Sequence, residues 1–328
     1  MSLFLAFVIL ALLFFAAAAI LAVVSFKLML RIKCYDSAYI EARGLEKGEF
    51  GPEDLAKPWI EDSVPSPFGY RIAVHALKGS APRVAIFHHG VTWNWIGAIK
   101  YMDVFLRDGW TVVALDSRGH GSTRFRDSNG SRKALHPSYG YYEKNDLLAV
   151  ADWALARFPS EEGFIVHGES LGAASVLQYA PLDARLDAVI ADCPFSSTLA
   201  ELDHRLRRTY VPKFLRPASI ALADLLVRRI DGFSLAEASP ERAVLETNVP
   251  ILFVHGRDDD FVPTAMSVSM YESRRSRLPG AMTELHLVDG ARHATSHQTD
   301  PVAYASAILD FTRRAIEARR GSAKAGIQ

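Results

Sequence analysis

The sequence has few cysteines and no excess of charge of either sign. Its 328 residues include two cysteines, Cys34 and Cys193, and 37 Lys and Arg against 37 Asp and Glu. Two cysteines cannot build a disulfide framework or a cysteine-rich zinc site. A nucleic-acid-binding protein would carry a basic excess, so we expect no nucleic-acid partner. The sequence also contains neither a P-loop nor a dinucleotide-binding fingerprint.

One long stretch has no charged side chain. It covers residues 2–26, and about 20 apolar residues in a helix are enough to cross a bilayer. Lys27, Arg31 and Lys33 follow at once, which places the C-terminal side of this segment in the cytoplasm by the positive-inside bias. A cleaved signal peptide, the alternative, would carry basic residues before a shorter apolar core. We therefore expect residues 1–33 to be a single transmembrane anchor with its basic flank, and the remainder to be cytoplasmic.

The rest of the chain has the composition of a packed protein, with 49% hydrophobic and 23% charged residues overall. After a polar connector over residues 34–67, short apolar runs alternate with amphipathic stretches. The pattern predicts strands at 83–87, 111–115, 163–167, 187–191, 251–255 and 285–288, and helices at about 97–108, 141–158, 171–180 and 301–319. Apolar strands alternating with helices predict a mostly parallel, doubly wound α/β sheet. In such a sheet the ligand crevice lies beyond the carboxyl ends of the strands.

The segment between the fourth and fifth predicted strands is unusually long. Residues 196–248 have a mostly helical pattern and exceed what one crossover helix requires. We expect them to form a helical cap over the crevice; an elaborated crossover is the alternative. Apolar and basic residues are interleaved in this segment, for example Tyr210 and Phe214 with Arg205 and Arg208, which suits an acyl chain beside an anionic head group or an ordinary solvated helix face.

A nucleophile motif follows one predicted strand and opens a helix. Gly168-Glu169-Ser170-Leu171-Gly172 has the sequence and the context of a G-x-S-x-G elbow, whose tight turn exposes the serine hydroxyl. A serine hydroxyl needs a base to become a good nucleophile. The acid and base are expected later, in the order Ser…Asp…His. Asp259 and His293, which each follow a later strand, occupy these places.

Taken together, the motifs resemble those of the α/β-hydrolase superfamily, specifically its serine-hydrolase branch of esterases, lysophospholipase-like enzymes and acyl-peptide-type hydrolases. In order they are His89-Gly90, D-x-R-G-H-G-S from Asp116 to Ser122, the serine elbow, and H-G-x-x-D-x-x-V-P from His255 to Pro263 with a late G-x-x-H ending at His293. The resemblance covers about residues 68–315. It implies the α/β-hydrolase fold over residues 68–320, with 321–328 as a tail.

Within this resemblance Asp259 is the triad acid, and the backbone N–H of Val91 joins that of Leu171, the residue after the nucleophile, in an oxyanion hole. Asp192 is the alternative acid, because some lipases of this fold place theirs on the earlier strand. The remaining polar residues near the motifs are given structural roles: Asp258 and Asp260 in loop solvation, Glu169 as a supporting carboxylate, His120 in holding its loop, His167 as a packed neighbour, and His297 at the start of the last helix.

The chemistry implied is acyl transfer through Ser170, His293 and Asp259, which needs no metal or organic cofactor. The sequence favours a serine hydrolase acting on a small-molecule or lipid ester. An acyltransferase or a peptidase would use the same triad. A non-catalytic, membrane-tethered binding module is less favoured, because such proteins commonly lose a triad member and all three are present here.

Overall fold

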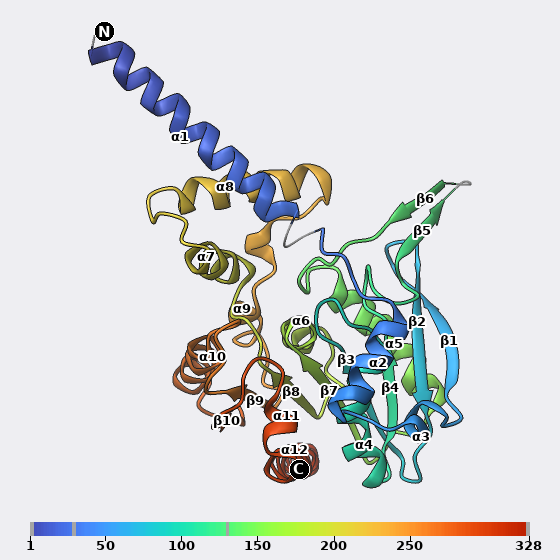
Figure 1. The fold of residues 1–328 in the computed structure, drawn as a ribbon. Coiled ribbons are helices and arrows are strands. Elements are labelled where there is room, and N and C mark those ends of the chain that lie inside the picture. The colour runs from blue at the N-terminus through green and yellow to red at the C-terminus, as the bar shows by residue number, and fades with distance from the viewer. Residues whose placement is uncertain (1–2, 28–30, 129–130, 326–328) are drawn as a thin grey trace.

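An eight-stranded sheet forms the centre of the protein (Figure 1). The structure is a computed structural model that describes residues 3–27, 31–128 and 131–325. The strands lie in the order β1-β2-β4-β3-β7-β8-β9-β10. Their bounds are β1 Ile60–Pro65, β2 Arg71–Leu77, β3 Arg83–His88, β4 Thr111–Leu115, β7 Gly163–Glu169, β8 Ala188–Asp192, β9 Ile251–Gly256 and β10 Thr283–Val288. The strands from β4 to β10 in this order pair in parallel, whereas β2 pairs in antiparallel fashion with both of its neighbours, β1 and β4. The predicted mostly parallel sheet is therefore confirmed.

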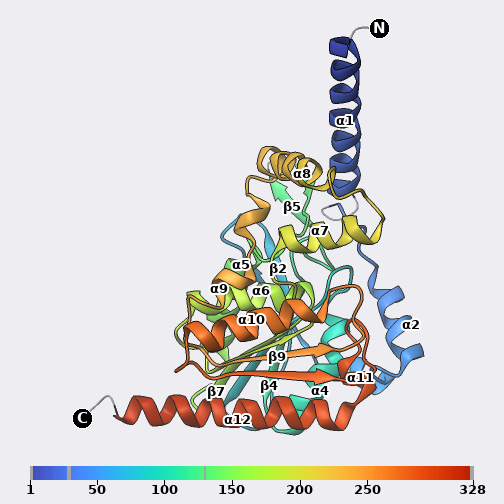
Figure 2. The ribbon, with the colours of Figure 1, turned by 90° about the vertical axis from the view of Figure 1, so that its left-hand side faces the viewer.

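Helices cover both faces of the sheet, so that a hydrophobic core lies on each face. Successive residues of a strand point alternately into one core and the other. In β3, Val84 and Ile86 pack with α5 (Glu143–Arg157), α6 (Leu171–Tyr179) and α10 (Thr264–Arg277). Ala85 and Phe87 pack on the other face with α4 (Ile99–Arg107) and α12 (Pro301–Ala325). Figure 2 shows α10 and α12 on opposite sides of β9. Because both faces of the central strands are buried, these strands contain apolar runs such as residues 84–87 and 251–254, which made them visible in the sequence.

The sheet begins earlier than the sequence suggested. β1 lies inside the range 34–67 that was expected to be a connector, together with α2 (Ser37–Lys47) and the short α3 (Pro52–Leu55). As an edge strand that is largely exposed, β1 carries charged residues and ends in Pro65, which hides its strand character. At the other end, α12 continues to Ala325, across the boundary expected for a tail at 321. A small hairpin, β5 (Phe125–Ser128) with β6 (Ser131–Ala134), lies outside the main sheet.

The predicted cap is helical and lies between β8 and β9. It contains α7 (Thr198–Arg208), α8 (Arg216–Ile230) and the short α9 (Pro240–Ala243). Ser197 caps α7 by accepting a hydrogen bond from the N–H of Ala200 at 3.3 Å, the usual role of serine at a helix start. The cap occupies the side of the molecule from which the N-terminal helix projects (Figures 1 and 2).

That N-terminal helix, α1 (Leu3–Ser25), is long and apolar enough to cross a membrane. Most of its side chains are exposed, but Ala18, Ala22 and Ser25 are buried where the helix packs against α8. Within the uncharged run, residues 3–25 are therefore one continuous helix that leaves the body of the protein at the cap.

Candidate active site

Ser170 lies at a sharp turn between β7 and α6. Its φ of 54° and ψ of −110° belong to a sparsely populated region of backbone geometry, as is common at functional sites. The turn is fixed by a hydrogen bond from the Ser170 N–H to the carbonyl of Asp192 at 2.8 Å. Gly168 and Gly172 flank it because any side chain on Gly168 would meet the backbone of Gly172, and any on Gly172 would meet the carbonyl of His88. The local sequence therefore shapes the elbow.

The structure brings the three predicted triad residues together. His293 Nε2 lies 2.9 Å from Ser170 Oγ, and His293 Nδ1 lies 2.7 Å from Asp259 Oδ2. A carboxylate only accepts hydrogen bonds, so Nδ1 carries the proton and Nε2 is left to accept from the serine hydroxyl. Ser170 and Asp259 are buried and His293 is partly exposed. The arrangement has the hydrogen-bond sequence of a nucleophile, a base and an orienting acid.

Asp259 is held from several directions. Its Oδ1 accepts the N–H groups of Phe261 at 3.0 Å and Val262 at 2.9 Å. Its Oδ2 accepts from His255 Nε2 at 3.1 Å as well as from His293. Burial alone would raise the pKa of Asp259, but the hydrogen bonds from His255 and His293 hold that pKa well below its usual value. Asp259 therefore stays ionised over the whole range in which a histidine titrates.

The sequence showed His255 only as part of a motif and did not reveal this supporting role. Its Nδ1 accepts from Ser267 Oγ at 2.7 Å, which leaves the proton on Nε2 for Asp259. The fully buried imidazole thus holds the same carboxylate oxygen, Oδ2, that accepts from His293. The sequence feature that could have revealed this support is a histidine near the end of a strand, four residues before the acid.

Neither the alternative acid, Asp192, nor the aspartates beside Asp259 reach His293 among the described contacts. Asp192 is fully buried and accepts from Tyr101 Oη at 3.3 Å and Ser296 Oγ at 3.4 Å. Burial, reinforced by the nearby Glu169 carboxylate, raises the pKa of Asp192 to about 6. Asp258 and Asp260 are exposed. Asp259 is therefore the carboxylate that the geometry joins to the histidine.

The predicted oxyanion donors, Val91 and Leu171, lie in one apolar cluster beside the elbow. Leu171 is the first residue of α6, where backbone N–H groups have no partner within the helix. The loop after Val91 is held by His120, whose Nε2 accepts from the Thr92 N–H at 3.2 Å while its Nδ1 bonds the Arg118 carbonyl at 2.9 Å. Burial lowers the pKa of His120 to about 4, so it is the neutral imidazole that this pair of bonds requires.

One cysteine lies next to the triad. Ligand atoms of Cys193, Asp259 and His293 all fall within 4.8 Å of one another, a spacing that a metal ion could use. The thiolate is the form that binds metals, and burial raises the pKa of Cys193 far above its usual value. Both other groups are already bonded to each other, so we assign no metal to this cluster.

A buried ion pair contacts the elbow at Glu169, the residue before Ser170. Lys100 Nζ lies 2.7 Å from Glu169 Oε2, and Tyr101 Oη donates to the same carboxylate oxygen at 2.6 Å. Lys100 also bonds the carbonyl of Ala294 at 3.4 Å, so one ammonium group links the residue before Ser170 with the residue after His293. Burial alone would lower the pKa of Lys100, but Glu169 and Glu49 hold it above its usual value. Sequence reasoning identified the structural role of Glu169 but missed Lys100.

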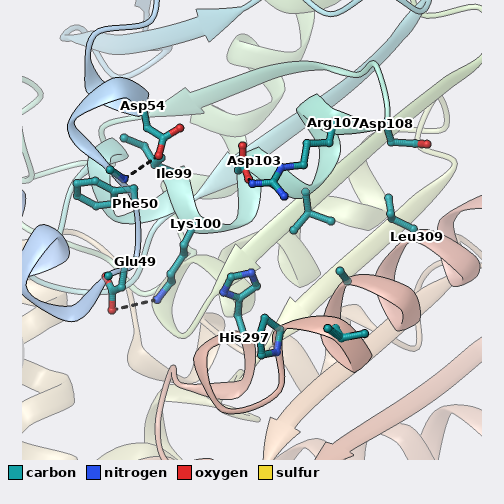
Figure 3. Close-up of a pocket in the computed structure, with 16 residues that line it drawn as sticks. Glu49, Phe50, Asp54, Ile99, Lys100, Asp103, Arg107, Asp108, His297 and Leu309 are labelled. Carbon is teal, nitrogen blue, oxygen red and sulfur yellow. Dashed lines mark hydrogen bonds and ion pairs between the residues drawn. The ribbon is translucent and has the colours of Figure 1, made fainter.

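Lys100 also lines a cavity of about 710 Å³ on the side of the sheet covered by α4 and α12 (Figure 3). Glu49 lies across from it at 4.0 Å, and His297 lies nearby. His297 is in the short helix α11 (Ser296–Thr299) that precedes α12. The residues that line this cavity include none of the predicted triad, although Lys100 connects it to Glu169 of the elbow.

The substitution Lys100→Met is expected to destabilise the fold by about 3 kcal/mol, because it leaves the buried Glu169 without its cationic partner. Urea unfolding of the detergent-solubilised chain measures this free energy. Lys78→Met, at an exposed lysine, is the control and should change it by less than about 0.5 kcal/mol. Adding Glu169→Gln to Lys100→Met should recover part of the loss. If Lys100→Met and Lys78→Met had the same free energy of unfolding, the proposed role of Lys100 would be contradicted.

Comparison with known proteins agrees with this architecture. The family model described as "Alpha/beta hydrolase family" matches residues 85–307. The uncharacterized protein YqkD of Bacillus subtilis (strain 168) is 33% identical over 253 residues, which cover 76% of this chain and 77% of YqkD. Protein ABHD12B of Homo sapiens is 28% identical over 211 residues, which cover 61% of this chain and about half (49%) of that protein.

Solved structures show the same fold. The esterase Pf2001 of Pyrococcus furiosus superposes with a TM-score of 0.60 at 19% identity, covering 81% of this chain and 96% of the esterase. An acylaminoacyl peptidase of Pyrococcus horikoshii superposes with a TM-score of 0.60 at 15% identity, covering 79% of this chain and 41% of the peptidase. From the family match and the similarity to YqkD, the chain belongs to the alpha/beta hydrolase family.

Proposed function

We propose that this protein is a serine hydrolase that cleaves carboxylic esters through Ser170, His293 and Asp259. The observation that carries the proposal is the continuous hydrogen-bond path from Ser170 Oγ through the His293 ring to Asp259, at 2.9 and 2.7 Å. The direction of these bonds leaves His293 Nε2 as the acceptor of the serine proton. Similarity to esterases and peptidases of the same fold supports a hydrolase; the ester is our more specific proposal.

In the proposed mechanism, His293 Nε2 takes the proton from Ser170 as Oγ attacks the ester carbonyl. The tetrahedral oxyanion is stabilised by the backbone N–H groups of Val91 and Leu171, each worth about 3 kcal/mol in the transition state. Asp259 holds the imidazole in its tautomer and stabilises the imidazolium without taking its proton. His293 returns the proton to the departing alcohol, and water then releases the acyl group by the same sequence of steps.

A fluorophosphonate probe tests the proposal, because it bonds covalently only to an activated serine. We expect about one label per chain, located at Ser170 by mass spectrometry of the peptide. Hydrolysis of p-nitrophenyl butyrate with and without an added alcohol separates a hydrolase from an acyltransferase, since the transferase would yield the exchanged ester as its main product. Labelling at another residue, or at none, would reject the proposed nucleophile.

We also propose that α1 is an uncleaved anchor and that the hydrolase domain lies in the cytoplasm. Support comes from its continuous apolar helix and from the basic residues that follow it, Lys27, Arg31 and Lys33. Protease added to intact spheroplasts of a producing bacterium should leave the hydrolase domain whole, and the protein should remain with membranes washed at high pH. Digestion from outside, or a mature protein that begins after residue 20, would contradict the anchor and its orientation.

A further inference from the structure

A second cavity lies between the anchor helix and the cap. Its volume is about 390 Å³, and its walls are mainly apolar. The lining residues are Leu21, Val24 and Ser25 of α1, Leu202, Arg205, Leu206 and Arg208 of α7, Thr209 and Val211 after α7, and Phe261. The last turns of the predicted membrane helix therefore form one wall of a cavity in the hydrolase body.

The cavity belongs to an apolar region that runs from the anchor to the elbow. One cluster of packed side chains includes Ala22 and Phe26 at the end of the anchor, Leu206 of the cap, and Leu171 directly after Ser170. Val91 packs against the same cluster. Packed apolar side chains thus connect the end of α1 with both proposed oxyanion donors.

Phe261 is adjacent to both the cavity and the triad. It lines the cavity, and the centroid of its ring lies 4.7 Å from that of the His293 ring. The guanidinium of Arg205 lies over the same ring at 4.1 Å from the centroid. The backbone N–H of Phe261 bonds Asp259 at 3.0 Å, so the wall of the cavity and the triad acid are parts of one loop.

We propose that this cavity binds the acyl chain of a single-chain ester drawn from the bilayer, with the end of the anchor helix as one wall of the site. This inference rests on the proposed ester hydrolase activity and names its substrate class. The occupant is an acyl chain because the cavity is mainly apolar and one of its walls is the end of the helix that we propose spans the membrane. Burial of each methylene then favours longer chains by about fourfold per carbon until the cavity is filled.

The basic residues at this site do not require an anionic head group. Arg205 pairs with Glu201 at 2.5 Å, and Arg208 pairs with Asp260 at 3.0 Å. Each guanidinium already has a carboxylate partner within the chain. The basic residues of the cap, which in the sequence suggested an anionic head group, therefore do not need one. A neutral monoacyl ester therefore satisfies the site.

Two adjacent valines of α1 provide a matched test. Val24 lines the cavity and Val23 does not, while their exposed fractions are 43% and 44%. Val24→Trp should lower the ratio of kcat/KM for p-nitrophenyl decanoate to that for the acetate by at least about tenfold, because the indole fills space that the chain needs. Val23→Trp should keep the ratio of the unchanged protein. A ratio taken within one variant does not depend on how much of that variant is folded.

A second measurement does not depend on turnover. The full-length Ser170→Ala chain is mixed with a monoacylglycerol whose 16-carbon acyl chain ends in a diazirine, and is then irradiated. Cross-links should appear at the cavity residues Leu202 and Phe261, should be displaced by excess monopalmitoylglycerol, and should fall at least about tenfold when Val24→Trp, but not Val23→Trp, is added.

The two measurements separate the acyl site from the proposed activity. If the cross-links form but no ester is turned over, the acyl site stands and the ester hydrolase proposal fails. If esters are turned over but the chain-length ratio is the same in both tryptophan variants and the cross-links are absent, the acyl site is overturned and the hydrolase stands.

Discussion

Ser170→Ala is expected to reduce ester hydrolysis by a factor on the order of 10⁶ in kcat, as loss of the nucleophile does in serine proteases. The reason is that the attacking oxygen is removed while His293 and Asp259 keep their places. Alanine fits at position 170, since the strain of the elbow lies in its backbone and the substitution removes only the hydroxyl that bonds His293. Initial rates with p-nitrophenyl butyrate and uptake of a fluorophosphonate label measure the loss.

Ser175→Ala is the matched control for this variant. Ser175 is also a buried serine near the start of α6, but its hydroxyl bonds only the carbonyl of Leu171 within the helix, at 2.8 Å. We expect Ser175→Ala to keep its label and to lose less than about tenfold in rate. Hydrolysis that survives in Ser170→Ala would show that another group attacks the ester.

The elbow and the sheet could be predicted from the sequence because their signals are local. Strands buried on both faces are uninterrupted apolar runs, and the glycines around Ser170 are required by contacts within one turn. β1 escaped prediction for the opposite reason: it lies at the edge of the sheet, is largely exposed and carries two charged residues, Glu61 and Asp62. A strand of that kind has the same composition as a loop.

Residues that act across the fold were harder to predict. Lys100 lies on a helix, where a lysine is usually exposed, and its role depends on Glu169 and Ala294, which are distant in the sequence. The contact of α1 with the cap was equally hidden. The uncharged run 2–26 shows that a helix can span a bilayer, but nothing in it indicates that Val24 lines a cavity.

The sequence alone could not decide which aspartate is the triad acid, and the geometry of the structure was needed. Asp258, Asp259 and Asp260 are adjacent, and Asp192 also follows a strand end, so composition cannot separate them. The side chain of Asp259 is buried, whereas those of Asp258 and Asp260 are exposed. Only the carboxylate of Asp259 has described hydrogen bonds to both His255 and His293.

Asp259→Asn is therefore expected to lower kcat by about 10⁴-fold, the loss that this change causes in serine proteases. The geometry explains why. Oδ1 accepts two backbone N–H groups, so the asparagine oxygen keeps that position and its NH₂ replaces Oδ2. The NH₂ then faces His293 Nδ1, which must accept, and the ring proton moves to Nε2. In that tautomer the imidazole cannot receive the proton of Ser170.

Three further asparagine variants serve as controls: Asp258→Asn, Asp260→Asn and Asp192→Asn. The first two are exposed residues, and Asp192 bonds Tyr101 and Ser296 rather than His293. Each should lose less than about tenfold in kcat. Thermal unfolding of all four variants shows whether a loss of rate comes from a loss of fold. If Asp192→Asn lost the activity and Asp259→Asn kept it, the acid would be the one on β8, and the hydrogen bond between His293 and Asp259 would be only structural.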